Sequence, residues 1–181
     1  MGLSLRKIRL RLVWLLVLPF LWFAAPTPRL LAVGAAVSLL GLALRAWAAG
    51  YIHKDMELAT RGPYAHVRNP LYVGSLLVGV GVTIAGGQWI FAAGFVLFYV
   101  WIYGKSARAE AEVLERKFGQ QYRDYAARVP LFLPQLLPAR VPGAATARFA
   151  AARWWKNREY EALLGLLGGL LFLAAKMVWW P

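Results

Sequence analysis

The stretch GPYAHVRNPLYVG, residues 62–74, stands at the start of a strongly apolar run and gathers polar and aromatic side chains at that border. The Gly-Pro pair favours a turn, and Pro70 suits the first turn of a helix, where its missing N–H costs nothing. A purely structural explanation is also available, in which Arg68 extends its charged end to the membrane surface and a tyrosine lies at that surface. The pattern predicts a helix that enters a membrane at residue 70.

Hydrophobic residues make up 60% of the 181 residues, whereas about 45 to 50% is usual in a soluble domain. A helix needs about 20 apolar residues to cross the hydrocarbon core, and in lipid its backbone must be hydrogen-bonded internally. The chain is therefore predicted to be an all-α, polytopic helical membrane protein with about five transmembrane helices. The five apolar runs lie near 10–25, 29–52, 70–86, 88–104 and 161–180.

The basic residues predict how these helices are oriented. With three exceptions, the 21 Lys and Arg fall before residue 12 or within 53–69 and 105–158, which five spans would place on one side of the membrane. The exceptions are Arg29, Arg45 and Lys176. This positive-inside pattern predicts an integral membrane protein with a cytoplasmic N-terminus, and it argues against nucleic-acid binding as the reason for the +13 charge. A composition rich in Ala, Leu and Arg suggests a bacterial inner membrane.

The polar region after the fourth run has helical periodicity. Over 105–128, five apolar residues fall within an arc of about 80° at 100° per residue, and this stripe needs a packing partner. They are Ala111, Leu114, Phe118, Tyr122 and Tyr125. Glu110 borders the stripe, so its carboxylate can face inward, and Gly119 is a candidate helix break. Four prolines in 129–142 exclude a continuous helix there, whereas 144–160 has the aromatic and basic pattern of an interfacial helix.

Two motifs in this order, on the same predicted side of the membrane, resemble the isoprenylcysteine carboxyl methyltransferases and the related phospholipid N-methyltransferases. The resemblance covers roughly residues 41–134. The first motif consists of Gly62, Pro63, Tyr64, Arg68, Pro70, Tyr72 and Gly74. The second consists of Glu110, Leu114, Phe118, Gly119, Tyr122, Tyr125, Val129, Pro130 and Pro134.

The resemblance implies transfer of a methyl group from S-adenosylmethionine to a membrane-soluble acceptor, in a cytosolic cofactor-binding cap. It implies Arg68 and Glu110 as catalytic residues, since Arg68 suits the cofactor carboxylate and Glu110 its ammonium group. A tyrosine ring suits the sulfonium or the adenine. The cofactor-binding residues expected on this basis are Lys54, Gly62, Tyr64, Arg68, Asn69, Pro70, Tyr72 and Glu110. For Lys54, a role as a positive-inside lysine is favoured over a contact with the cofactor carboxylate.

Two positions depart from the family pattern. Asn69 stands where the family usually has His, and Ala111 stands where a second glutamate is common. Asparagine donates a hydrogen bond but carries no proton to exchange at neutral pH, so an acid-base role at this position is in doubt. No metal site is expected, because the two histidines, His53 and His66, are isolated and the chain has no cysteine. We expect His66 at the surface.

One integral membrane domain is expected over 1–181. It would comprise an N-terminal helical hairpin (1–52), a methyltransferase core (53–138), and a basic interfacial segment with the final span (139–181). That span would complete the bundle, anchor the basic tail or mediate a homodimer through GLLGGL at 165–170. The small residues of GVGVTIAGG, 79–87, predict close helix packing, with a tight turn at Gly86 and Gly87. Arg45 either snorkels or lines a substrate path.

The expected partners are the lipid bilayer and a lipophilic methyl acceptor. The acceptor remains open among an isoprenylcysteine-like carboxylate, a phospholipid amine and another small lipophilic nucleophile. Two alternative functions also remain. A membrane reductase resembling the steroid reductases would bind NADPH, and a non-catalytic scaffold would hold anionic lipid on its basic surface.

Overall fold

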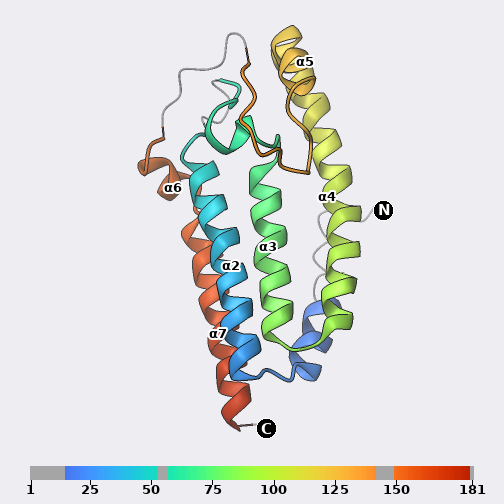
Figure 1. Cartoon of the computed structure of the whole chain (residues 1–181), viewed down its shortest axis with the longest axis vertical. Coiled ribbons are helices and arrows are strands. Elements are labelled where there is room, and N and C mark those ends of the chain that lie inside the picture. The colour runs from blue at the N-terminus through green and yellow to red at the C-terminus, as the bar shows by residue number, and fades with distance from the viewer. Residues whose placement is uncertain (1–14, 53–56, 142–148, 180–181) are drawn as a thin grey trace, which may run out of the picture.

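The computed structural model describes residues 15–52, 57–141 and 149–179, and its regular structure in these ranges is helical throughout (Figure 1). This confirms the all-α prediction. The helical elements are residues 15–23, α2 (Pro28–Ala49), η1 (Gly62–Ala65), α3 (Pro70–Ala85), α4 (Trp89–Phe118), α5 (Gln120–Ala126), α6 (Ala152–Lys156) and α7 (Tyr160–Trp179).

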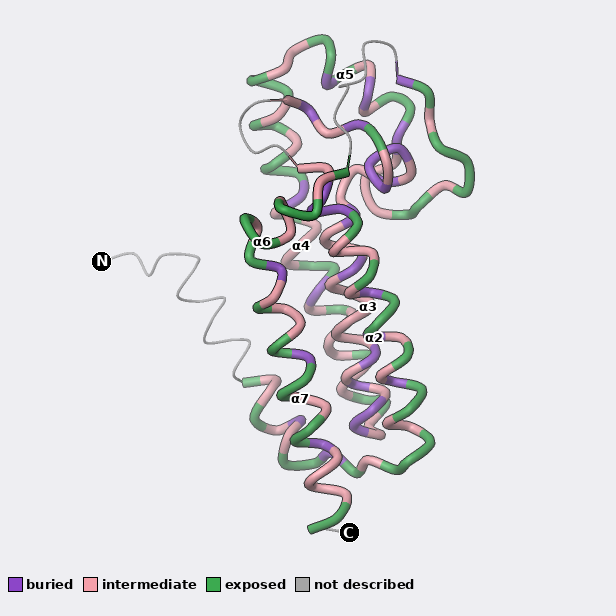
Figure 2. Tube along the Cα trace, turned by 90° about the vertical axis from the view of Figure 1, so that its left-hand side faces the viewer, coloured by how far each residue is buried: buried purple, intermediate pink, exposed green. Residues whose placement is uncertain are grey.

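Three of these helices, α2, α4 and α7, are long and apolar enough to cross a membrane, which makes the chain an integral membrane protein. Large apolar side chains such as Leu40 and Leu97 are exposed on them, and Figure 2 shows exposed residues along the outward-facing sides of the bundle. α3 is apolar but has only 16 residues, or about 24 Å, which is shorter than the roughly 30 Å hydrocarbon core. Of the first expected span, near 10–25, the structure describes a helix only over 15–23.

Close packing of α2 against α3 forms the centre of the bundle. A Cβ on Gly81 would overlap Ser38 and the Gly34 carbonyl, and the Ser38 hydroxyl donates to the Val78 carbonyl over 3.1 Å. The prediction of close packing for 79–87 is therefore confirmed. The expected turn is also present, since Gly87 takes φ 74° between α3 and α4.

α4 does not end with its apolar run. The apolar run of the fourth expected span ends near residue 104, and the helical periodicity expected from residue 105 onward is present as a continuation of α4 to Phe118, which reaches beyond α2 and α3 in Figure 1. No Gly or Pro lies in 105–118, so nothing breaks the helix until Gly119. There the backbone takes φ 53° and ψ −123°, a conformation open mainly to glycine, and α5 begins directly after it.

The proline-rich segment, residues 129–141, is free of helix as expected and lies along η1. Gln135 N–H donates to the His66 carbonyl over 3.0 Å, and Ala139 N–H donates to the Ala65 carbonyl over 2.9 Å. η1, α5 and this segment together build a cap on one end of the bundle, which we call the polar end.

The C-terminal segment differs from its prediction. Of the interfacial helix expected over 144–160, the described part contains only the five residues of α6. Arg158 takes φ 58° after it, so the chain turns before α7 begins. α6 still presents Trp154 and Trp155, whose rings lie 5.0 Å apart, near the polar end.

Candidate functional site

Hydrogen bonds join the two motifs that the sequence singled out. The Tyr72 hydroxyl donates to Glu110 Oε2 over 3.0 Å, although 38 residues separate them. Arg68 Nη1 donates to the Tyr122 hydroxyl over 3.1 Å. The start of α3 and the polar end of α4 and α5 therefore form one site.

A cavity of about 360 Å³ lies between these segments, within the range of roughly 300 to 1,000 Å³ that is usual for ligand sites. We call it the main cavity. Its lining consists of Ile52, Glu57, Leu58, Ala59, Tyr64, Arg68, Asn69, Ala107, Glu110, Ala111, Val113, Leu114, Lys117, Phe118, Tyr122 and Tyr125.

The predicted apolar stripe forms one wall of the main cavity. Ala111, Leu114 and Phe118 pack against a core cluster that includes Tyr122 and Tyr125. The stripe therefore finds its packing partner in the cap, since Val129 and Val141 of the proline-rich segment complete the cluster together with Leu58. Because Gly119 bends the chain, α5 turns both tyrosines toward the cavity.

The proline-rich segment holds the opposite wall in place. Arg68 N–H donates to the Pro130 carbonyl over 2.9 Å, and Asn69 Nδ2 donates to the Leu131 carbonyl over 3.2 Å. The Asn69 side chain does not cap α3, and its amide instead hydrogen-bonds the proline-rich segment. His66 was expected at the surface but is half-buried, with Nδ1 2.9 Å from the Gln135 carbonyl oxygen.

Both signs of charge line the main cavity, because its lining contains Arg68 and Lys117 as well as Glu57 and Glu110. Within the described structure, Arg68 Nε is buried and has no hydrogen-bond partner. A buried N–H without an acceptor costs free energy, which an anion in the cavity would recover. The lining thus suits a ligand that carries a negative and a positive group.

Tyr64 contributes a neutral phenol to the cavity. Burial raises its pKa well above the usual value of 10.0, and the nearby Tyr125 and Glu110 raise it further. Its side chain is 8% exposed, and its carbonyl accepts from the Tyr125 hydroxyl over 2.8 Å. Tyr64 therefore offers a ring and a protonated hydroxyl at physiological pH.

The predicted site residues fall into three groups. Tyr64, Arg68, Asn69 and Glu110 line the main cavity, and Tyr72 contacts it through Glu110. Two others lie outside it, since Gly62 takes φ 60° against the Tyr51 ring and Pro70 is the buried first residue of α3. Lys54 and His53 lie outside the described residues.

Sequence reasoning missed two charged lining residues. Lys117 lies seven residues after Glu110 on α4, and this helical spacing would have pointed to it. Glu57 lies in an irregular segment, where no periodicity marks it. Ala111, which replaces the second glutamate of the family pattern, makes the wall apolar at that point, and the exposed Glu112 does not line the cavity.

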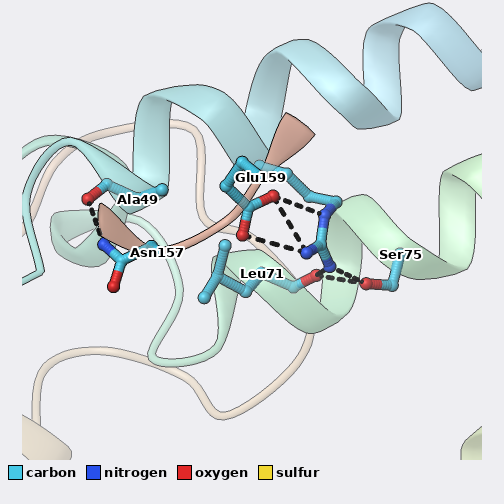
Figure 3. A network of polar contacts seen from close by, with 6 residues as sticks. Ala49, Leu71, Ser75, Asn157 and Glu159 are labelled. Atoms are coloured by element: carbon cyan, nitrogen blue, oxygen red, sulfur yellow. Dashed lines mark hydrogen bonds and ion pairs between the residues drawn. The ribbon is translucent and has the colours of Figure 1, made fainter. Parts of the chain in front are cut away.

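A polar network ties the C-terminal part of the chain to the bundle near this site (Figure 3). Arg45 of α2, which was expected to snorkel or to line a path, donates from Nε and Nη2 to the two carboxylate oxygens of Glu159, each over 3.0 Å. It also hydrogen-bonds Ser75 Oγ. The Glu159 side chain is only 5% exposed, and nothing in the sequence pattern marked it as this partner.

Comparisons with known proteins agree on the family. The sequence profile of the family described as "Phospholipid methyltransferase" matches residues 30–121, more than half of the chain. The chain is 37% identical over 106 residues to the nickel-cobalt-cadmium resistance protein NccN of Alcaligenes xylosoxydans xylosoxydans, covering 55% of this chain and 49% of that protein. It is 34% identical over 116 residues to the cobalt-zinc-cadmium resistance protein CzcN of Cupriavidus metallidurans, covering 61% and 51%.

The protein-S-isoprenylcysteine O-methyltransferase of Schizosaccharomyces pombe is 33% identical over 86 residues, covering 48% of this chain and 36% of that enzyme. The chain thus spans about half, or less, of the length of these relatives. No solved structure matches it. The profile match includes the whole first motif and Glu110, and Tyr64, Arg68 and Glu110 of these line the main cavity; the chain belongs to the phospholipid methyltransferase family.

Proposed function

We propose that this protein transfers a methyl group from S-adenosylmethionine to a membrane-soluble acceptor, at the main cavity. The observation that carries the proposal is that Arg68 and Glu110, from two distant motifs, line one cavity in a member of a family named for methyl transfer. The acceptor would be an isoprenylcysteine-like carboxylate, a phospholipid amine or another small lipophilic nucleophile.

The charges of the cavity fit the methionine end of this cofactor. Arg68, whose buried Nε has no partner in the described chain, would hold the carboxylate. Glu110 would hold the ammonium group, and the Tyr72 hydroxyl that donates to it would fix its orientation. Phe118 and Tyr122 offer aromatic faces for the adenine.

The bound cofactor supplies a methyl group activated on a sulfonium cation. The chain itself then has to align the two reactants and exclude water, because an in-line displacement needs the reacting atoms close together and in line. Tyr64 suits this part, since its neutral ring can face a cation without offering a competing nucleophile. Neither Arg68 nor Glu110 needs to exchange a proton if the acceptor is a carboxylate.

The position of the cavity would suit access from lipid. One of its walls is the polar end of α4, residues 107–118, and the remaining length of this helix carries exposed apolar residues such as Leu97 and Trp101. A lipophilic acceptor would enter laterally along them, and the polar end of the bundle would face the cytoplasm of a bacterium. We place the cap over the cofactor on this side.

Binding of S-adenosylmethionine to the full chain in nanodiscs, measured by calorimetry, tests the proposal. Arg68→Ala and Glu110→Ala each remove a charged contact worth about 1.5 to 3 kcal/mol, so each should weaken binding roughly 10- to 100-fold. Arg108→Ala and Glu112→Ala are matched controls, because both residues are exposed on α4 and do not line the cavity. Their affinities should equal that of the wild type.

Transfer of labelled methyl groups into a bacterial lipid extract is the second readout, and the variants that fail to bind should also fail to transfer. A folded wild type that does not bind S-adenosylmethionine contradicts the proposal. Saturable NADPH binding by that sample would favour a reductase instead. Salt-sensitive association with anionic lipid alone would favour a scaffold.

A further inference from the structure

A second cavity, of about 510 Å³, lies beside η1 and is separate from the main cavity in its lining residues. Gly62 and Ala65 of η1 face it, whereas Tyr64 of the same turn lines the main cavity. Its other walls come from Tyr51, which follows the end of α2, from residues 138–141 at the C-terminal end of the proline-rich segment, and from Phe149. The polar and aromatic side chains among its lining residues are Tyr51, Thr60, Arg61, Arg140 and Phe149.

Three polar groups in this lining lack partners within the described chain. Thr60 is 2% exposed, and its Oγ1 has no hydrogen-bond partner. Arg61 and Arg140 are exposed, and their side chains make no ion pair or hydrogen bond with described residues. By contrast, Arg45 and Arg123 each pair with a glutamate. A buried hydroxyl without a partner is costly, so it points to a ligand group that would accept its hydrogen bond.

The charge of the second cavity selects an anion. Among the described residues, its lining contains two arginines and no acidic residue, whereas that of the main cavity contains two glutamates. Guanidinium groups bind phosphate oxygens through paired N–H donors, and a threonine hydroxyl supplies a further donor. The side chains of Arg61, Arg140 and Thr60 are three hydrogen-bond donors without an acceptor among the described residues, and the oxygens of a phosphate group would supply one for each.

The position of the second cavity suggests where such a phosphate comes from. Tyr51 follows the end of α2 by two residues, and its ring lies 6.2 Å from that of Phe149. Trp154 and Trp155 of α6 follow close by in the chain. Aromatic residues gathered at the end of apolar helices mark the level of lipid headgroups.

From these observations we propose that the second cavity binds a phosphate group, held by Arg61, Arg140 and Thr60, and that an anionic phospholipid headgroup at the membrane surface supplies it. This site is independent of the proposed methyl transfer, because none of the three residues lines the main cavity. The same phosphate chemistry is present in soluble organic phosphates, and the experiment separates the two sources.

Native mass spectrometry of the detergent-purified full chain tests the site with phosphatidylglycerol and phosphatidylcholine as probes. The wild type should retain phosphatidylglycerol at least ten-fold better, and Arg61→Gln/Arg140→Gln should bring the two lipids to equal retention. Arg108→Gln/Arg128→Gln removes the same net charge from exposed positions away from the cavity and should change nothing. Equal loss of lipid in both double variants would overturn the site in favour of a diffuse basic surface.

Thr60→Val separates a ligand contact from a structural role. Without lipid, this variant should melt at the same temperature as the wild type or higher, because it removes an unpartnered buried hydroxyl. The amount of phosphatidylglycerol that this variant retains should be several-fold lower than for the wild type. Unchanged retention would contradict the proposed contact. Displacement of the lipid by millimolar glycerol phosphate would assign the phosphate site to a soluble ligand, and failure of glycerol phosphate to compete would assign it to the headgroup.

Discussion

At Asn69 a single amide joins two walls of the main cavity. Its Nδ2 donates to the Leu131 carbonyl of the proline-rich segment, while the neighbouring Arg68 lines the cavity with its guanidinium. The residue departs from the family pattern, and the departure has a structural explanation here, because what the position supplies is a hydrogen-bond donor. A histidine supplies a donor as well.

Substitution of Asn69 tests this donor role. Asn69→Leu leaves the Leu131 carbonyl without its partner, so we expect a loss of about 1 to 3 kcal/mol in the free energy of unfolding and weaker S-adenosylmethionine binding. Asn69→His should keep both near the wild-type values. Thermal unfolding in detergent and calorimetry measure the two quantities. If the histidine variant behaves like the leucine variant, the donor role is wrong.

Single residues were predictable to different degrees. Tyr64, Arg68 and Glu110 were predicted because they belong to the two motifs that resemble those of the methyltransferase family. Glu57 was not predictable, because its segment lacks a repeating geometry that would say where its side chain points. Gly62 was expected at the cofactor, but its positive φ serves a turn against Tyr51.

Among the elements, the break between α4 and α5 determines the shape of the main cavity. Gly119 adopts φ 53° and ψ −123°, and a Cβ there would meet no neighbour within 4 Å, so backbone conformation alone requires glycine. The break turns α5 so that Tyr122 and Tyr125 reach the cavity.

Gly119→Ala should therefore cost about 1 to 3 kcal/mol of strain in the free energy of unfolding, and relief of that strain should displace α5 and weaken S-adenosylmethionine binding. Gly104→Ala is the matched control on the same helix. It has ordinary helical geometry and open space for a Cβ, so it should be neutral or stabilising by up to about 1 kcal/mol. Equal affinity in both variants would contradict this role of the break.

The elements were well predicted where hydrophobicity or periodicity marks them. The apolar run 70–86 became α3, and the stripe over 111–125 became a cavity wall. The extent of α4 was not predictable from its apolar run, because hydropathy indicates where lipid ends and a helix continues until the backbone is interrupted. The GLLGGL segment of α7 packs on no described neighbour at its glycines, and a homodimer through it stays a prediction.

For the whole molecule, the Arg45–Glu159 pair fastens α2 to the start of α7. Loss of one partner from a buried ion pair leaves an uncompensated charge, so Arg45→Gln and Glu159→Gln should each lower the free energy of unfolding by about 3 to 5 kcal/mol. The double variant should lose much less than the sum of the two. Thermal unfolding of all four proteins measures the coupling.

The exposed pair of Arg158 and Glu161 is the control for this cycle, because both side chains are more than half exposed. Glu161→Gln should leave the melting temperature nearly unchanged. Additive effects at Arg45 and Glu159 would mean that the contact does not fasten the helices. The sequence could not predict this pair, since hydropathy places α7 in the membrane without fixing which face meets α2.

The separation of Arg45 and Glu159 by 114 residues also has a consequence for biosynthesis. A ribosome that adds about 5 to 20 residues per second delivers Glu159 roughly 6 to 23 s after Arg45. During that interval, once α3 has emerged, the partners of the α2 arginine among the described residues are Ser75 and the Leu71 carbonyl. The insertion machinery must therefore accommodate an unneutralised cation at the membrane border until the last helix arrives.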